Sequence, residues 1–403
     1  MSNNLNLRCL YINILCLFLV NRHLLEYAKR NLSYWEIALL LQKQCGVKLS
    51  ANAIGKRLKK LGSPSKRGPL RHTDNEIRQA VQNALAECPI TVGYRHMTDI
   101  LRSKGYHVRR DTVMQVLREL DPIGVHFRHR RRIRRKVYCS AGPNNVWHVD
   151  GYDKLKPYGF AIHGCIDGFS RRLMWLNVAS TNNNPKVMAA NYVECVKSVK
   201  GCPLILQADP GTENFDMGAL QCFFRRNHSD MFSKDRSFRV VRSVFNQRIE
   251  AWWSMFRRQK SQWFMDLFKD LEVFGAFRKD HAMDIYCLRY CFMPLIQREL
   301  DAIKDQWNSH RISQSRQAIC PGGRPDVLYL SPESVGGKEC LQKANDVDID
   351  WAFTQCQEVC RSGCQEFDAF AGLEFLSLNW EDASTVDESL RQYFHLITLL
   401  GLV

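Results

Sequence analysis

The alternation of apolar and polar positions in the middle of the chain predicts an α/β domain. Three apolar, strand-like runs follow one another with only short turns between them, at residues 146–150, 158–167 and 172–179. Two more strand-like runs, at residues 204–209 and 238–242, are separated by stretches with helical spacing. The helices expected here cover residues 185–200, 217–226, the stretch from Gln247 onward, and further segments within 273–308. This order predicts one sheet with helices packed on its faces.

Capping boxes upstream of this domain predict two helical units, at residues 31–62 and 73–120. In the first unit, the side chains of Ser33 and Glu36 are spaced to satisfy each other's free backbone amides at a helix start. The second unit begins with the same pattern at Thr73. The chain therefore carries an all-α region ahead of its α/β domain.

The second helix of the first unit is expected to begin at Ser50, and it has an apolar face and a basic face. Ile54, Leu58 and Leu61 fall on one side of this helix. The cations that lie off this side are Lys56, Arg57, Lys59 and Lys60. Two short helices, a Gly turn and a basic second helix predict a helix-turn-helix that binds DNA. The alternative is an ordinary helical hairpin with a solvated basic face.

Residues 1–30 predict a leader or a helix of unknown role. The apolar run at residues 11–20 is shorter than the roughly 20 residues that a membrane-spanning helix needs. No small-residue cleavage site follows it, which argues against a signal peptide. The sequence thus predicts an intracellular protein with no membrane partner.

The charge of the chain is strongly positive and unevenly distributed. The 403 residues carry a formal net charge of +16. From Ser331 to the end, thirteen Asp and Glu stand against four Lys and Arg, which leaves +25 on residues 1–330. The basic part favours a polyanionic partner such as nucleic acid. The acidic region, 331–403, contains apolar stretches but no pattern that predicts a fold.

A dense basic run lies in the segment 121–140, which reads as a linker between the helical units and the α/β domain. Its seven cations are Arg128, Arg130, Arg131, Arg132, Arg134, Arg135 and Lys136. Such a run is expected to follow the DNA backbone, and it is also typical of a nuclear localisation signal. A solvated linker with no partner is the alternative.

The sixteen cysteines are scattered through apolar segments, and no C-x-x-C pair occurs. This pattern favours reduced, mostly buried thiols in an intracellular protein over a disulfide scaffold. The run from Cys356 to Cys364 is expected to be helical, which puts the sulfurs of Cys356, Cys360 and Cys364 on one face. We expect packing there and no structural zinc; a metal site is the alternative.

Three carboxylates carry the candidate chemistry. Asp150 and Asp209 each end an apolar, strand-like run, and Glu250 lies in an aromatic-rich helical stretch. Each alone has an ordinary explanation, as a turn residue or a half-buried helix carboxylate. Together they suit two Mg²⁺ or Mn²⁺ ions, because hard cations prefer oxygen ligands and a metal pair can straddle a phosphate.

Residues 141–315 resemble the integrase and transposase catalytic core, the Asp, Asp, Glu branch of the ribonuclease H-like fold. The matching motifs are Asp150, IDGFSR at 166–171, DPGTEN at 209–214, NQRIE at 246–250 and WNSHRIS at 307–313. Among such proteins the chain is most similar to the animal integrase-core proteins of mobile-element origin. The segment 92–120 resembles the second helix-turn-helix of insertion-sequence transposases. The resemblance implies an α/β, ribonuclease H-like core, with a five-stranded mixed sheet flanked by helices, preceded by all-α helix-turn-helix units.

The resemblance also implies a function in DNA integration. The expected activity is that of a metal-dependent polynucleotidyl transferase that acts on double-stranded DNA, as a homo-oligomer, in the nucleus. The retroviral type of integrase carries an N-terminal His/Cys zinc module, and this chain has no such spacing. The alternative is a domesticated, catalytically silent DNA-binding protein derived from a mobile element.

Further residues have supporting roles in this interpretation. Asp167 is expected to bond backbone amides in a turn, and Glu213 and Asn214 border the second ligand, where they either position substrate or cap a helix. Asn246 belongs to the NQRIE motif. Arg257 lies two helical turns after Glu250 and, with Lys260, is expected to contact DNA phosphates. A solvated helix charge is the alternative for both cations.

Overall fold

The computed structural model of the protein describes residues 20–30, 32–62, 72–87, 92–106, 108–129, 138–314, 319–357 and 360–402. The chain forms two compact units. One comprises residues 1–135, 309–314 and 322–336, and the other comprises residues 136–308, 315–321 and 337–403.

The second unit is built on a five-stranded mixed sheet, as predicted. Its strand order is β3-β2-β1-β5-β6. The strands are β1 (Val146–Tyr152), β2 (Ala161–Asp167), β3 (Leu173–Ala179), β5 (Ile205–Ala208) and β6 (Phe238–Val240). The first three pair antiparallel, whereas β1 with β5 and β5 with β6 pair in parallel. Parallel neighbours need crossovers, and helices supply them.

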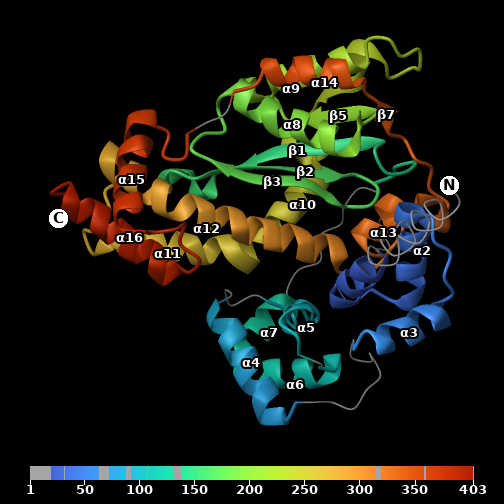
Figure 1. Cartoon of the computed structure of the whole chain (residues 1–403), viewed down its shortest axis with the longest axis horizontal. Helices are drawn as coiled ribbons and strands as arrows, with labels where there is room; N and C mark the ends of the chain where they lie inside the picture. Colours follow the sequence, from blue (N-terminus) through green and yellow to red (C-terminus); the bar gives the residue numbers. More distant parts are fainter. Residues whose placement is uncertain are drawn as a thin grey trace, which may run out of the picture. The chain divides into compact units, whose positions relative to one another are not determined.

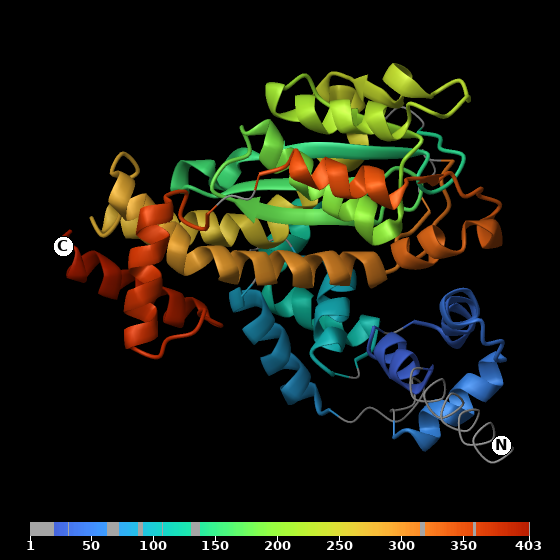
Figure 2. The same cartoon turned by 45° about the horizontal axis from the view of Figure 1, so that its top comes forward.

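Helices cover both faces of this sheet, as two views of the chain show (Figure 1, Figure 2). One face packs against α8 (Pro185–Val199) and α9 (Phe215–Phe224), where Trp147 and Leu206 join Tyr192 in a buried core. The other face packs against α10 (Gln247–Phe256), α11 (Gln262–Val273) and α12 (Ala282–Ser309), which form the larger core. The aromatic residues of α10 and α11 lie in this core or pack against it.

The long helix α12 covers the outer edge of β3. The Asn308 side chain accepts a hydrogen bond from the Leu173 amide at 2.8 Å and donates to the Leu173 carbonyl at 3.0 Å. Eleven residues earlier on the same helix, Gln297 accepts from the Val178 amide at 3.0 Å and donates to the Leu176 carbonyl at 3.1 Å. These two side chains satisfy backbone groups that an edge strand otherwise leaves open.

The acidic C-terminal region, for which the sequence predicted no fold, is mostly helical, and its residues 337–403 belong to the second unit. Its helices are α14 (Asp346–Thr354), α15 (Gln365–Ser377) and α16 (Val386–Leu399). Trp351 of α14 stacks on Phe223 at a ring-centroid distance of 4.5 Å, whereas Phe375 of α15 meets Tyr290 of α12 at 5.2 Å. A two-residue strand, β7 (Gln342–Lys343), pairs with β4 (Gly201–Cys202). The region therefore supplies part of both cores.

The helical arrangement considered for the three C-terminal cysteines is wrong. Cys356 follows the end of α14, and Cys360 and Cys364 lie in the connection that precedes α15. This connection is not helical in the described residues, so the three sulfurs do not share a helix face. Within the described ranges, all cysteines are free thiols.

The first unit is all-helical, as predicted. The helices α2 (Tyr34–Cys45) and α3 (Ala51–Lys60) begin at the expected caps, Ser33 and Ser50. They pack with the helical residues 20–29 and with α13 (Pro325–Leu330) around a core centred on Ile37 and Ile54. Gly55 allows close packing, because a Cβ there would lie 2.9 Å from the Tyr34 ring.

A second helical core follows in the same unit. It is formed by α4 (Asp74–Glu87), α5 (Tyr94–Ser103) and α6 (Arg110–Leu120), around Ile77, Leu101 and Val113. The segment expected as a linker from residue 121 begins with a further helix, α7 (Pro122–His129). No helix within the described residues of the chain is both long and apolar enough to cross a membrane.

Candidate active site

Asp150 lies on the face of β1 that packs against α10. Side chains alternate along a strand, so Trp147 and Val149 point into the core beneath α8. Tyr152 points to the opposite face and packs on Trp253 of α10, with ring centroids 5.1 Å apart. Asp150, two residues before Tyr152, shares that face.

Asp209 follows the end of β5, the parallel neighbour of β1. His148 pairs with Gln207 in this ladder. When the register is continued by two residues, Asp150 comes beside Asp209. Neighbouring strands lie about 4.8 Å apart, so the two carboxylates arise from adjacent positions at one end of the sheet.

Glu250 lies in the first turn of α10, one helical turn before Trp253. The Trp253 indole Nε1 donates a hydrogen bond to Asp150 Oδ2 at 3.0 Å and so joins this helix to the carboxylate on β1. The Glu250 amide donates to the Asn246 carbonyl at 3.2 Å, which is the first hydrogen bond of the helix. The three carboxylates predicted from the sequence are therefore carried by elements that meet at one place.

The electrostatics of the three carboxylates are coupled. Burial raises the pKa of Asp150 to about 8, aided by the negative charges of Glu250 and Asp209, and the hydrogen bond from Trp253 offsets part of this effect. Burial and then the charge of Asp209 raise the pKa of Glu250 as well. Such a concentration of like charge at a half-buried position is typical of a functional site.

The donor set fits a divalent cation that prefers oxygen. Three carboxylates are the ligands of choice for Mg²⁺ or Mn²⁺, and a cation would relieve the repulsion that raises the pKa of Asp150. In the parts of the chain that the structure describes, no three His, Cys, Asp or Glu side chains form a ready-made metal cluster. The carboxylates thus share a location and a charge state that suit a cation, without a preformed cage.

Asn214 and Glu213 lie beside Asp209. The buried Asn214 amide Nδ2 donates to the Asp209 carbonyl at 3.3 Å and to the Glu213 carboxylate at 3.2 Å, with Asp209 Oδ1 at 3.4 Å. Gly211 leaves room for this arrangement, because a Cβ there would collide with the Glu213 carboxylate. The DPGTEN motif therefore folds back on itself and holds Asp209 from one side.

Asp167 has the turn role expected for it. Its carboxylate accepts hydrogen bonds from the Asn144 amide at 2.7 Å and from the Ser170 amide at 2.8 Å and hydroxyl at 2.7 Å. Burial raises its pKa to about 6, and these hydrogen bonds oppose that rise. Its oxygens are occupied by the turn, so Asp167 shapes the end of β2.

Asn246 is fully buried directly before α10. Its Nδ2 donates to the Val149 carbonyl at 2.7 Å, and its Oδ1 lies 2.8 Å from His148 Nδ1. From the sequence, Asn246 is indicated only as part of the NQRIE motif. The contact of Trp253 with Asp150 is not predicted, although the position of Trp253 three residues after Glu250 on a predicted helix was the available signal.

Arg257 and Lys260 lie in an irregular part of the helix that carries Glu250. A π-helical turn, Arg257–Ser261, separates α10 from α11. Arg257 is exposed at its start, whereas the Lys260 ammonium forms an ion pair with Glu299 Oε2 of α12 at 2.9 Å. The charge of Lys260 is thus compensated within the unit.

The cations predicted for the first helix-turn-helix differ in accessibility. Lys56, Lys59 and Lys60 are exposed on α3. The Arg57 guanidinium donates to Asn21 Oδ1 at 2.8 Å and is half-buried. Of the basic run, Arg128 belongs to α7 with a side chain that is not described. The rest lies outside the described residues: Arg130, Arg131, Arg132, Arg134, Arg135 and Lys136.

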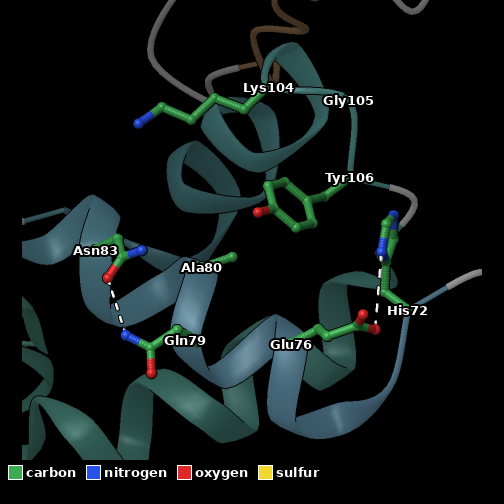
Figure 3. Close-up of a pocket in the computed structure, with 8 residues that line it drawn as sticks. All are labelled: His72, Glu76, Gln79, Ala80, Asn83, Lys104, Gly105 and Tyr106. Carbon is green, nitrogen blue, oxygen red and sulfur yellow. Dashed lines mark hydrogen bonds and ion pairs between the residues drawn. The ribbon is translucent and has the colours of Figure 1, made fainter.

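A separate hollow of about 390 Å³ lies in the second helical core, between α4 and the turn after α5 (Figure 3). Tyr106 reaches over Ala80 across its floor, and Gln79 donates to Asn83 at 3.0 Å on its rim. Its polar residues pair along the rim, and it belongs to the unit that does not carry the carboxylates. We assign it no chemistry.

Comparison with known families agrees with the geometry of the second unit. Residues 137–322 match the family model described as the integrase core domain, and the matched range contains all three carboxylates. A comparison with curated proteins found no match. The segment 137–322 of this chain is therefore an integrase core domain.

Proposed function

We propose that this protein is an integrase- or transposase-like polynucleotidyl transferase that cleaves and joins phosphodiester bonds in double-stranded DNA. The observation that carries the proposal is the coupling of Asp150, Asp209 and Glu250 at one end of the sheet, within a segment that matches the integrase core domain.

Asp150, Asp209 and Glu250 would hold two Mg²⁺ or Mn²⁺ ions. Bound there, such ions would activate a water or a 3′-hydroxyl of the DNA for attack on phosphorus and would stabilise the departing oxygen. Asp150 must lose its proton for this role, since metal ligands bind in the deprotonated form. Because its pKa is raised to about 8, we expect cation binding to release a proton near neutral pH.

The chain's other residues would orient the carboxylates and the DNA. Trp253 holds Asp150 through Oδ2. Arg239 is exposed on β6, and the segment between β6 and α10 exposes Arg242 together with Phe245, which is 50% exposed. Guanidinium groups next to the carboxylates suit the phosphates on either side of the reacting bond, and an exposed aromatic ring suits an unstacked terminal base.

The first unit would supply most of the affinity for DNA. Exposed Lys56, Lys59 and Lys60 on α3 are available to phosphates, and the basic run at residues 128–136 would add further contacts. The same run is the basis for proposing a nuclear protein. Because joining requires two DNA ends to meet, we further propose that the working form is a homo-oligomer.

The test is an incubation of the full chain with labelled duplex that carries the DNA ends flanking its gene, in Mg²⁺ or Mn²⁺. We expect metal-dependent nicking or joining that disappears in Asp209→Asn. The matched control is Asp266→Asn, which removes an exposed carboxylate from α11 of the same unit and should keep full activity. Cleavage that persists in Asp209→Asn would contradict the assignment. Tight, sequence-specific binding with no cleavage would instead favour a domesticated DNA-binding protein.

A further inference from the structure

A buried chain of polar side chains runs beneath the carboxylates from β1 to the start of α10. It consists of Tyr138, His148 and Asn246. The Tyr138 hydroxyl lies 2.8 Å from His148 Nε2, and His148 Nδ1 lies 2.8 Å from Asn246 Oδ1. His148 is 1% exposed and Asn246 is fully buried, so these hydrogen bonds do not compete with water.

The direction of each hydrogen bond follows from its partners. The Val149 carbonyl can only accept, so the group of Asn246 that faces it at 2.7 Å is the donating Nδ2. Asn246 Oδ1 must then accept, which places the proton of the neutral His148 ring on Nδ1. His148 Nε2 is left as the acceptor for the Tyr138 hydroxyl. One arrangement of protons therefore satisfies the hydrogen bonds between Asn246 and Val149, between His148 and Asn246, and between Tyr138 and His148.

Neighbouring groups are compatible with this arrangement. Gln207 Nε2 lies 3.2 Å from the protonated His148 Nδ1, but it donates to the Phe245 carbonyl at 3.3 Å instead. Gly168 leaves space for the Tyr138 hydroxyl, since a Cβ there would lie 2.2 Å from it. The Arg248 guanidinium covers the Tyr138 ring at 4.1 Å. The hydroxyl, the imidazole and the amide are thus held in place from several sides.

Asn246 links the two elements that carry Asp150 and Glu250. Its side chain forms hydrogen bonds to two residues of β1: Val149, the residue before Asp150, and His148, two residues before Asp150. Its backbone carbonyl accepts from the amide of Glu250 at 3.2 Å. An asparagine directly before a helix usually caps it, but this side chain makes no such hydrogen bond. It is used instead to join the helix to the strand.

We propose that Asn246, supported by His148 and Tyr138, is a positioning residue that fixes Glu250 relative to Asp150. None of the three needs to touch DNA or metal; they act through the backbone of both ligand-bearing elements. The inference rests on the proposed two-metal function, because it assigns these residues the task of holding two ligands at the spacing that a shared cation requires. Groups that orient metal ligands typically change affinity or activity by about 10–100-fold when removed.

The experiment measures Mn²⁺ binding to the full chain by electron paramagnetic resonance, alongside Mn²⁺-dependent cleavage of flanking-end DNA and thermal unfolding. The test variant is Asn246→Leu, which removes both side-chain hydrogen bonds at similar volume. The matched control is Asn308→Leu, which removes two side-chain hydrogen bonds to one residue of β3 in the same sheet. Asp150→Asn identifies the part of the Mn²⁺-binding signal that arises from the carboxylate site, because that part should be lost in this variant. His148→Leu, alone and combined with Asn246→Leu, tests whether the two side chains act together.

We expect Asn246→Leu and Asn308→Leu to lower the unfolding temperature alike, but only Asn246→Leu to weaken Mn²⁺ binding, by about tenfold or more. The double variant should lose little beyond Asn246→Leu alone, because the pair acts as a unit. Unchanged Mn²⁺ affinity in Asn246→Leu, or an equal loss in Asn308→Leu, would overturn the positioning role alone. If the wild type shows no Mn²⁺ binding that Asp150→Asn removes, the proposed function fails and this inference falls with it.

Discussion

Replacing Asp150 with asparagine should make the metal-free protein more stable, and increasingly so as the pH rises. Burial and the charges of Glu250 and Asp209 raise the pKa of this carboxyl from 3.8 to about 8 in the folded protein. An acid whose pKa is higher in the folded than in the unfolded state binds more protons when folded. Stability is therefore lost as the pH rises from about 4 to about 8. Asparagine carries no charge at any of these pH values.

The size of the effect follows from the same shift. One pKa unit corresponds to about 1.4 kcal/mol, so a rise from 3.8 to about 8 sets a ceiling of roughly 6 kcal/mol at pH 8.5. Side-chain relaxation and water access reduce such figures, and we expect a realised gain of about 1–3 kcal/mol. Because about 1 kcal/mol moves the unfolding temperature of a domain of this size by about 2–4 °C, the gain should be about 2–12 °C. The amide still offers an oxygen to the Trp253 indole, so that hydrogen bond is kept.

The assay is thermal unfolding in EDTA at a series of pH values, repeated with Mg²⁺. Wild type and Asp150→Asn should unfold at similar temperatures at pH 4.5 and diverge up to pH 8.5. Mg²⁺ should stabilise the wild type and leave the variant unchanged, because the cation binds the charged carboxylates. The exposed Asp266 again supplies the control: Asp266→Asn should show no pH-dependent gain. A variant that is less stable than wild type at pH 8.5 in EDTA would refute the reasoning.

Three further outcomes follow from the structure. Trp252→Ala should destabilise the second unit by about 3–5 kcal/mol, because this ring is 1% exposed in the larger core. Denaturant unfolding measures the loss, and a value below about 1 kcal/mol would contradict the packing. Deletion of residues 337–403 should expose both cores and yield an aggregating or protease-sensitive chain, and a soluble, cooperatively folding product would show that the region is dispensable. Replacement of Lys56, Lys59 and Lys60 by alanine should reduce the slope of the logarithm of the DNA-binding constant against the logarithm of the salt concentration by about 0.9 per lost phosphate contact. The unfolding temperature should stay unchanged. An unaltered slope would place the contact surface elsewhere.

The parts of the fold that the sequence predicted depend on local signals. The caps at Ser33 and Ser50 predicted helix starts. The apolar runs at residues 146–150 and 172–179 predicted the strands observed at Val146–Tyr152 and Leu173–Ala179, because each signal lies within a few residues of the element that it specifies. The identity of the three carboxylates came from ordered motifs.

The relations between distant residues could not be predicted in the same way. The hydrogen bond between Asn246 and the Val149 carbonyl joins residues 97 positions apart, and no periodicity predicts such a contact. The helix α15 was not predicted for a different reason. Apolar residues occur on all sides of this helix, with Leu373 exposed and Phe375 buried, so the sequence there has no amphipathic pattern. Ser261, the last residue of the π-helical turn Arg257–Ser261, contacts Tyr152 on β1, and this contact is again non-local.

The hydrogen bonds from the Gln297 and Asn308 side chains of α12 to the backbone of β3 affect how molecules of this protein can associate. Gln297 and Asn308 occupy backbone groups to which a strand from a second molecule would otherwise bind, so the sheet cannot grow at that edge. The opposite edge is β6, a strand of only three residues with a charged Arg239 at its centre. Several copies held on DNA at high local concentration, as in the oligomer proposed above, would thereby be protected from sheet-to-sheet aggregation. Such copies would associate through helices and loops, whose contacts can form and dissociate as the DNA is bound and released.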